Sequence, residues 1–117
     1  MLLTHSLDHG VLVVTVHRDP GVGGRAALLG KIGDLVHACR PAPVVIVLDD
    51  AATDGAALSV VLRVHRLCSG LGILMSVATG SAPARRVLEA NADTSGTRLA
   101  IHARTDTAVS AAFAAAA

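Results

Sequence analysis

A glycine-rich segment, 21–26, is the first part of this sequence whose residue types could bind a ligand. It fits the G-x-G-x-x-[GA] pattern that opens a helix in dinucleotide-binding folds, and Asp49 follows at the end of the next expected strand. Glycines let the backbone approach a phosphate, and the amides of a helix N-terminus attract anions. Residues 17–20 separate the preceding strand from Gly21, however, and 11 of the 117 residues are glycine. A nucleotide- or cofactor-binding module using Gly21 to Ala26 is therefore our alternative interpretation, beside a flexible loop.

Side chains that usually bind metals or carry out catalysis are scattered along the chain. The 6 histidines have no cysteine or carboxylate cluster beside them, and His5 and His9 flank an expected turn. No G-x-S-x-G motif is present, and no serine or cysteine is placed next to a histidine by spacing. Cys39 and Cys68 lack CxxC spacing, which favours buried thiols over redox chemistry. We therefore expect a protein that is not an enzyme, with no catalytic residue, no metal and no cofactor.

The segment 49–58 is the most informative, because it leads from the clearest strand into an apolar helix. Asp54 is expected to cap that helix. A helix N-terminus exposes unpaired amides and the positive end of the helix dipole, so it favours anions and phosphorylated side chains. Thr53 and Ser59 flank this point and are weak candidates for phosphorylation, although a capping or solvated role is favoured for both.

The elements that must position these residues alternate between strand and helix. Apolar and β-branched runs predict strands over 2–7, 11–16, 44–48, 73–78 and 99–102, and helical spacing predicts helices over 28–39, 57–68, 81–90 and 105–117. A hairpin followed by alternating elements predicts one α/β domain over 1–117, with a mostly parallel sheet. Partners of such sheets bind at the loops that leave the strand C-termini, here 18–24, 49–56 and 79–82.

Three residues carry further expectations about the helix ends. Ser81 is expected to cap the third helix, which Pro83 enters in its first turn. Asn91 is expected to end that helix in the left-handed conformation. Phe113, on the alanine-rich C-terminal helix, is expected to dock onto the sheet.

The composition excludes several classes of function. Hydrophobic residues make up 52% of the chain and charged residues 16%, which excludes general disorder. The single aromatic residue and the net charge of +1 argue against nucleic-acid, sugar and membrane-surface binding. The N-terminus lacks a basic n-region, and no uncharged run reads as a membrane span. We therefore expect a cytoplasmic protein with neither nucleic acid nor membrane as its partner.

Two segments resemble the STAS family, the anti-sigma factor antagonist domains. The run Asp54-Gly55-Ala56-Ala57-Leu58 stands where the family has Asp-Ser-Ser-Gly-Leu, and a helix rich in leucine, valine and arginine follows it. The run from Ser81 to Glu89 is similar to the family's Pro-x-x-Arg-Arg-Val-Leu-Glu helix. The length of the chain and the expected order of its strands and helices agree with those of the family from Leu2 to Phe113. The resemblance implies a STAS-type α/β fold, a mixed sheet of about five strands with an N-terminal hairpin and about four helices.

The resemblance also implies a function. In the family, the second serine of the motif is phosphorylated by a kinase-type anti-sigma factor, and only the unphosphorylated form binds that kinase. Here Ala56 occupies that position and has no hydroxyl. We expect an anti-anti-sigma factor in bacterial transcription regulation that binds an anti-sigma factor or a related regulator without phosphorylation at Ala56; a self-assembling STAS scaffold, such as a homodimer, is a further alternative. The expected partner-binding residues are Asp19, Gly21, Gly23, Asp54, Gly55, Ala56, Ala57, Leu58, Ser59 and Arg63.

Overall fold

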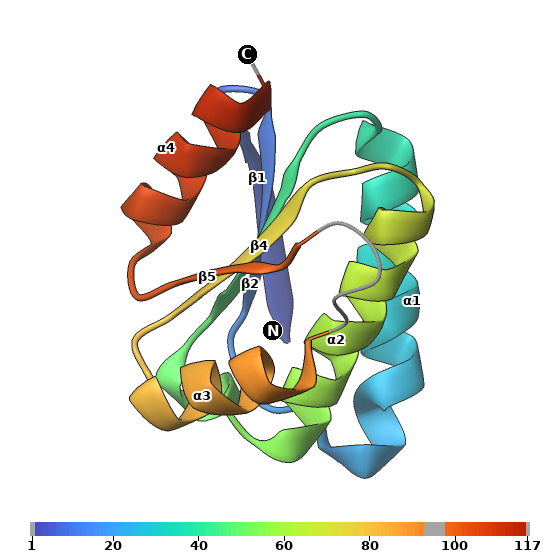
Figure 1. Cartoon of the computed structure of the whole chain (residues 1–117). Helices are drawn as coiled ribbons and strands as arrows, with labels where there is room; N and C mark the ends of the chain where they lie inside the picture. Colours follow the sequence, from blue (N-terminus) through green and yellow to red (C-terminus); the bar gives the residue numbers. More distant parts are fainter. Residues whose placement is uncertain (1, 93–97, 117) are drawn as a thin grey trace.

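Within residues 2–92 and 98–116, the computed structural model describes a five-stranded sheet and four α-helices (Figure 1). The strands are β1 (Leu3–Asp8), β2 (Val11–Val16), β3 (Val44–Leu48), β4 (Met75–Thr79) and β5 (Ala100–His102). The helices are α1 (Gly21–Cys39), α2 (Gly55–Gly70), α3 (Ala82–Asn91) and α4 (Thr105–Ala116), and a short 3-10 helix, η1 (Asp50–Ala52), precedes α2. The predicted α/β class and element order are confirmed.

The five strands lie side by side in the order of the sequence, β1-β2-β3-β4-β5. β1 pairs antiparallel with β2, and each later pair is parallel, as the hairpin prediction requires. Each parallel strand lies on the same side of the strand before it in the sequence, so right-handed crossovers place α1, α2 and α3 on one face of the sheet. α4 covers the other face. These strands therefore lack the reversal of order at which dinucleotides bind in doubly wound sheets.

The β-branched runs of β2 and β3 supply side chains to both faces of the sheet. Residues alternate along each strand, so Val14 and Ile46 pack beneath α1 to α3, whereas Val13 and Val45 pack beneath α4. The α4 residues that pack against Val13 and Val45 are alanines, since Ala108 and Ala112 are the buried residues of that helix. The predicted burial of β2 on both faces is confirmed, with Val11 to Val14 all buried.

The structure corrects two expectations at helix ends. Asn91 is the last residue of α3 and does not adopt the left-handed conformation; its side-chain amide instead donates to the carbonyl of Val87 at 2.8 Å. Phe113 does not dock onto the sheet: 53% of it is exposed, and its ring lies 6.0 Å from that of His9 in an edge-on arrangement. The cause is helical spacing, because Ala112 faces the sheet and the next residue is turned by about 100° away from it.

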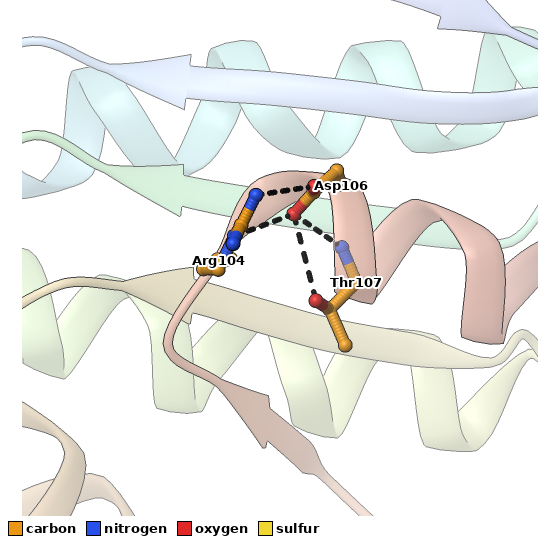
Figure 2. Close-up of polar contacts among 3 residues, drawn as sticks. All are labelled: Arg104, Asp106 and Thr107. Atoms are coloured by element: carbon orange, nitrogen blue, oxygen red, sulfur yellow. Dashed lines mark hydrogen bonds and ion pairs between the residues drawn. The ribbon is translucent and has the colours of Figure 1, made fainter.

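Two helix starts are fixed by local hydrogen bonds. Ser81 caps α3 as predicted, since its hydroxyl oxygen accepts from the amide of Ala84 at 3.1 Å. At the start of α4, the guanidinium of Arg104 donates to both carboxylate oxygens of Asp106, at 3.1 and 2.8 Å (Figure 2). Asp106 also accepts from the amide of Thr107. The hydrogen bond from Arg104 is the main reason that the pKa of Asp106 lies below its usual value.

No helix in the described part of the chain is both long and apolar enough to cross a membrane.

Candidate functional site

The carboxylate of Asp19 joins the N-termini of α1 and α2. One of its oxygens accepts from the amide of Gly21, the first residue of α1, at 2.9 Å. The other accepts from the amide of Ala57, in the first turn of α2, also at 2.9 Å. The amide of Asp19 itself donates to the carbonyl of Ala51 at 2.9 Å. Asp19 was expected as a contact residue, and in the structure it holds two helix starts together at the carboxyl ends of β2 and β3.

This arrangement corrects the expectation that the Asp54 side chain caps α2. Asp54 does occupy the N-cap position, and its carbonyl accepts from the amide of Leu58, but its carboxylate makes no capping hydrogen bond. Pro20 stands at the N-cap of α1 and also provides no side-chain cap. The first amides of a helix have no partner within the helix, and they carry partial positive charge. A single carboxylate on Asp19 therefore satisfies amides of both helices.

The first turn of α1 also differs from the expected flexible loop over residues 18–24. The helix already begins at Gly21, which has a φ of +70°, and Gly23 lies exposed in its first turn. The amide of Gly21 is hydrogen-bonded to Asp19, and a carboxylate repels phosphate. This contact weighs against a phosphate site over Gly21 to Ala26, although it does not involve the later amides of that segment.

The five residues that resemble the family motif divide into two groups. Asp54 and Gly55 are exposed, and Ala56 is partly exposed. Ala57 and Leu58 are only 1% and 6% exposed, so their side chains belong to the core. The surface at the start of α2 is therefore made by the first three motif residues.

Two grooves run along the sides of α2. The first, of about 200 Å³, separates α2 from α1, and the second, of about 330 Å³, separates α2 from α3. Ser59 and Arg63 line both grooves, so they form the ridge between them. The first groove is lined by Val22, Arg25, Ala26, Leu29, Ser59, Val60 and Arg63. The second is lined by Gly55, Leu58, Ser59, Leu62, Arg63, Arg66, Val87 and Asn91.

Three arginines give these grooves a positive rim. Arg25, Arg63 and Arg66 are exposed, and none of them forms an ion pair with another described residue. Sequence reasoning placed Arg63 at the site and included Val22, which is 77% exposed, only as part of the loop 18–24, whereas it missed Arg25 as a partner residue. Their spacing would have placed both on one helix face, had the start of α1 been predicted at Gly21.

The two alternative phosphorylation candidates lie in different surroundings. The hydroxyl of Thr53 donates to the carbonyl of Asp50 at 3.1 Å and so closes the turn of η1. Ser59 lies on the ridge between the grooves and is partly exposed. Of the two hydroxyls, only that of Ser59 belongs to the candidate partner surface.

A separate polar contact joins Thr4, His17 and Asp49, which spacing did not predict. Nδ1 of His17 lies 2.7 Å from a carboxylate oxygen of Asp49, and Nε2 lies 2.7 Å from the hydroxyl oxygen of Thr4. Hydroxyl, imidazole and carboxylate stand in the order that nucleophilic enzymes use. However, neither Thr4 nor His17 lines the polar cavity of about 360 Å³ that Asp49 borders. We assign the contact a structural role, since it ties β1 to the ends of β2 and β3.

The two thiols also differ in their surroundings. Cys68 is fully buried, and burial raises the pKa of its thiol to about 11. Cys39 is partly exposed near the end of α1. Neither forms a disulfide.

Within residues 2–92 and 98–116, no three histidine, cysteine, aspartate or glutamate side chains are grouped closely enough to hold a metal ion. No protein-family model matches the chain, and no curated protein is significantly similar to it.

Proposed function

We propose that this domain regulates another protein by binding it, as the STAS-type anti-sigma factor antagonists do. The binding surface consists of Asp54, Gly55, Ala56, Ser59 and Arg63, with one groove on each side, and is called the α2 surface below. The observation that carries the proposal is the first turn of α2. It presents Gly55 and Ala56, which have small side chains without hydroxyls, and it leads into the ridge of Ser59 and Arg63 that separates two grooves bordered by arginines.

The shape and charge of the α2 surface indicate the chemistry of the partner. Gly55 and Ala56 have almost no side chain, so a partner backbone can approach the helix start closely. The walls of the groove between α1 and α2 are mostly apolar and take up apolar side chains, and the arginines, which form no ion pair with another described residue, favour acidic groups around them. We therefore expect the partner, a kinase-type anti-sigma factor or a related regulator, to present apolar side chains bordered by carboxylates.

The first experiment is a pull-down from the native host, followed by a binding measurement with the purified partner. Arg63→Glu reverses a charge on the α2 surface, and Asp54→Lys places a long cation at its edge; both are expected to lower binding at least about ten-fold. Lys31→Glu, an exposed position of α1 outside both groove linings, is the matched control. Equal binding by Arg63→Glu and Lys31→Glu would contradict the proposal.

The second experiment tests the absence of a phosphorylation switch. The purified domain is incubated with the partner kinase and ATP, and its mass is measured. We expect no phosphoryl group on the wild type, because Ala56 has no hydroxyl, and one on Ala56→Ser if the kinase still recognises the helix start. A phosphoryl group on wild-type Thr53 or Ser59 that abolishes binding would refute regulation without a switch.

A further inference from the structure

A further cavity lies on the opposite side of the sheet from the α2 surface, beneath the last turns of α4. Its volume is about 100 Å³. β4 and β5 form its floor with Ser76, Ala100 and His102, and α4 forms its roof with Ala111, Ala112 and Ala115. Because these helix residues are alanines, α4 leaves space above the edge of the sheet.

Two polar atoms in the walls of this cavity have no hydrogen-bond partner among the described residues. Ser76 is 6% exposed, and its side chain points toward α4, since Ala78 two residues later packs against α4. Its hydroxyl oxygen and Nε2 of His102 are both buried and have no hydrogen-bond partner within residues 2–92 and 98–116. A buried polar group without a partner destabilises the fold, because it has lost its hydrogen bonds to water, so such groups point to a bound molecule.

A positively charged side chain, that of Arg98, borders the same cavity. Arg98 precedes β5, lines the cavity together with Ala100 and His102, and is exposed. It forms no ion pair or hydrogen bond with another described residue. A guanidinium donates two parallel hydrogen bonds to a carboxylate, and a hydroxyl and an imidazole can donate further ones.

We propose that this cavity binds a small carboxylate of one or two carbons, such as acetate, with its charge toward Arg98 and its methyl group against the alanines of α4. The size agrees, because a protein cavity of roughly 150 Å³ binds benzene, which has six heavy atoms, so about 100 Å³ suits the four heavy atoms of acetate. The ligand's oxygens accept from Ser76 and His102, which gives both buried polar atoms a partner. The apolar walls exclude a fully hydrated ion such as phosphate from the inner part.

The test is an NMR titration of the whole chain with sodium acetate at constant ionic strength, with sodium chloride as the reference. We expect saturable shifts confined to the methyl groups of Ala100, Ala111, Ala112 and Ala115. Pivalate, which carries the same charge on a much bulkier group, is expected to leave them unchanged. Shifts that grow without saturation, or that chloride reproduces, would show that only water fills the cavity and would overturn the proposal.

Variants separate the ligand site from a merely buried hydroxyl. Arg98→Gln and Ser76→Ala are each expected to weaken acetate binding by about ten-fold, because each removes a hydrogen bond to a charged group. The matched controls are Arg86→Gln and Ser110→Ala, exposed positions that do not line the cavity. The proposal is wrong if Ser76→Ala raises the melting temperature while its acetate affinity equals that of the wild type.

Discussion

Replacing Asp19 with alanine tests the central feature of the candidate site, the carboxylate shared by two helix starts. The substitution removes the hydrogen bonds to the amides of Gly21 and Ala57, each 2.9 Å long. It also removes a negative charge from the positive ends of two helix dipoles. Since Asp19 lies 38 positions before Ala57, the second loss affects a helix that is remote in the sequence.

The expected loss follows from the number of caps. Loss of one N-cap side chain destabilises a protein by about 1 kcal/mol, within a range of roughly 0.5–2. Asp19 caps two helices and is partly exposed, so we expect Asp19→Ala to lower the free energy of unfolding by about 2 kcal/mol. For a domain of about this size, that corresponds to a fall in melting temperature of roughly 8 °C. Asp19→Asn is expected to lose about half as much, because one amide oxygen can still accept.

Asp54 provides the matched control, because it occupies the N-cap position of α2 without a capping hydrogen bond from its side chain. Asp54→Ala loses only the interaction of an exposed charge with the helix dipole, about 0.3–1 kcal/mol. Thermal and urea unfolding followed by circular dichroism measure all three variants. If Asp54→Ala destabilises the domain as much as Asp19→Ala does, then the assignment of the cap to Asp19 is wrong.

Three further predictions concern the thiols, the start of α4 and nucleotides. At pH 8 a thiol reagent is expected to modify Cys39 in the folded protein and Cys68 only after unfolding, because burial raises the pKa of Cys68 to about 11 and the thiolate is the reactive form. The pKa of the Asp106 carboxyl, followed by NMR, is expected to lie below its usual value and to return toward it in Arg104→Gln. Because the pKa of Asp106 is lower in the folded state, this carboxyl stabilises the fold at pH values above its unfolded pKa, and that stabilisation is lost as the pH falls through the folded pKa. Millimolar ATP or NAD is expected to leave the melting temperature unchanged, and a saturable rise would favour the nucleotide-binding interpretation.

The strands were predictable from the sequence, whereas the start of α1 was not. The runs of β2 and β3 are apolar on both faces, which is a local property of the residues themselves. The first turn of α1 contains three glycines, which disfavour helix, so local propensity places the start of the predicted helix too late along the chain, at residue 28 instead of Gly21. Tertiary contacts outweigh that propensity, because Leu28, Ile32 and Val36 bury one face of α1 and Asp19 caps its start.

The candidate site was predictable only where it depends on nearby residues. The start of α2 near Asp54 follows from a local pattern, and the structure places it within two residues of the prediction. The hydrogen bond between Asp19 and the amide of Ala57 could not be predicted, because the two residues are 38 positions apart and no sequence pattern links them. The prediction that Phe113 docks onto the sheet was wrong for a similar reason. The hydrophobicity of Phe113 alone indicates burial, but the packing of Ala108 and Ala112 decides which side of α4 faces the sheet.

The role of Asp19 changes how mutations at the candidate site must be interpreted. Its carboxylate fixes the starts of α1 and α2 relative to each other, and the groove between these helices is the one that Ser59 and Arg63 border. Loss of Asp19 would therefore alter the groove even if no partner touches this residue. Reduced partner binding by Asp19→Ala alone is consequently no evidence of contact. Arg63 is the more informative position, because its exposed side chain has no ion pair among the described residues and contributes no cap.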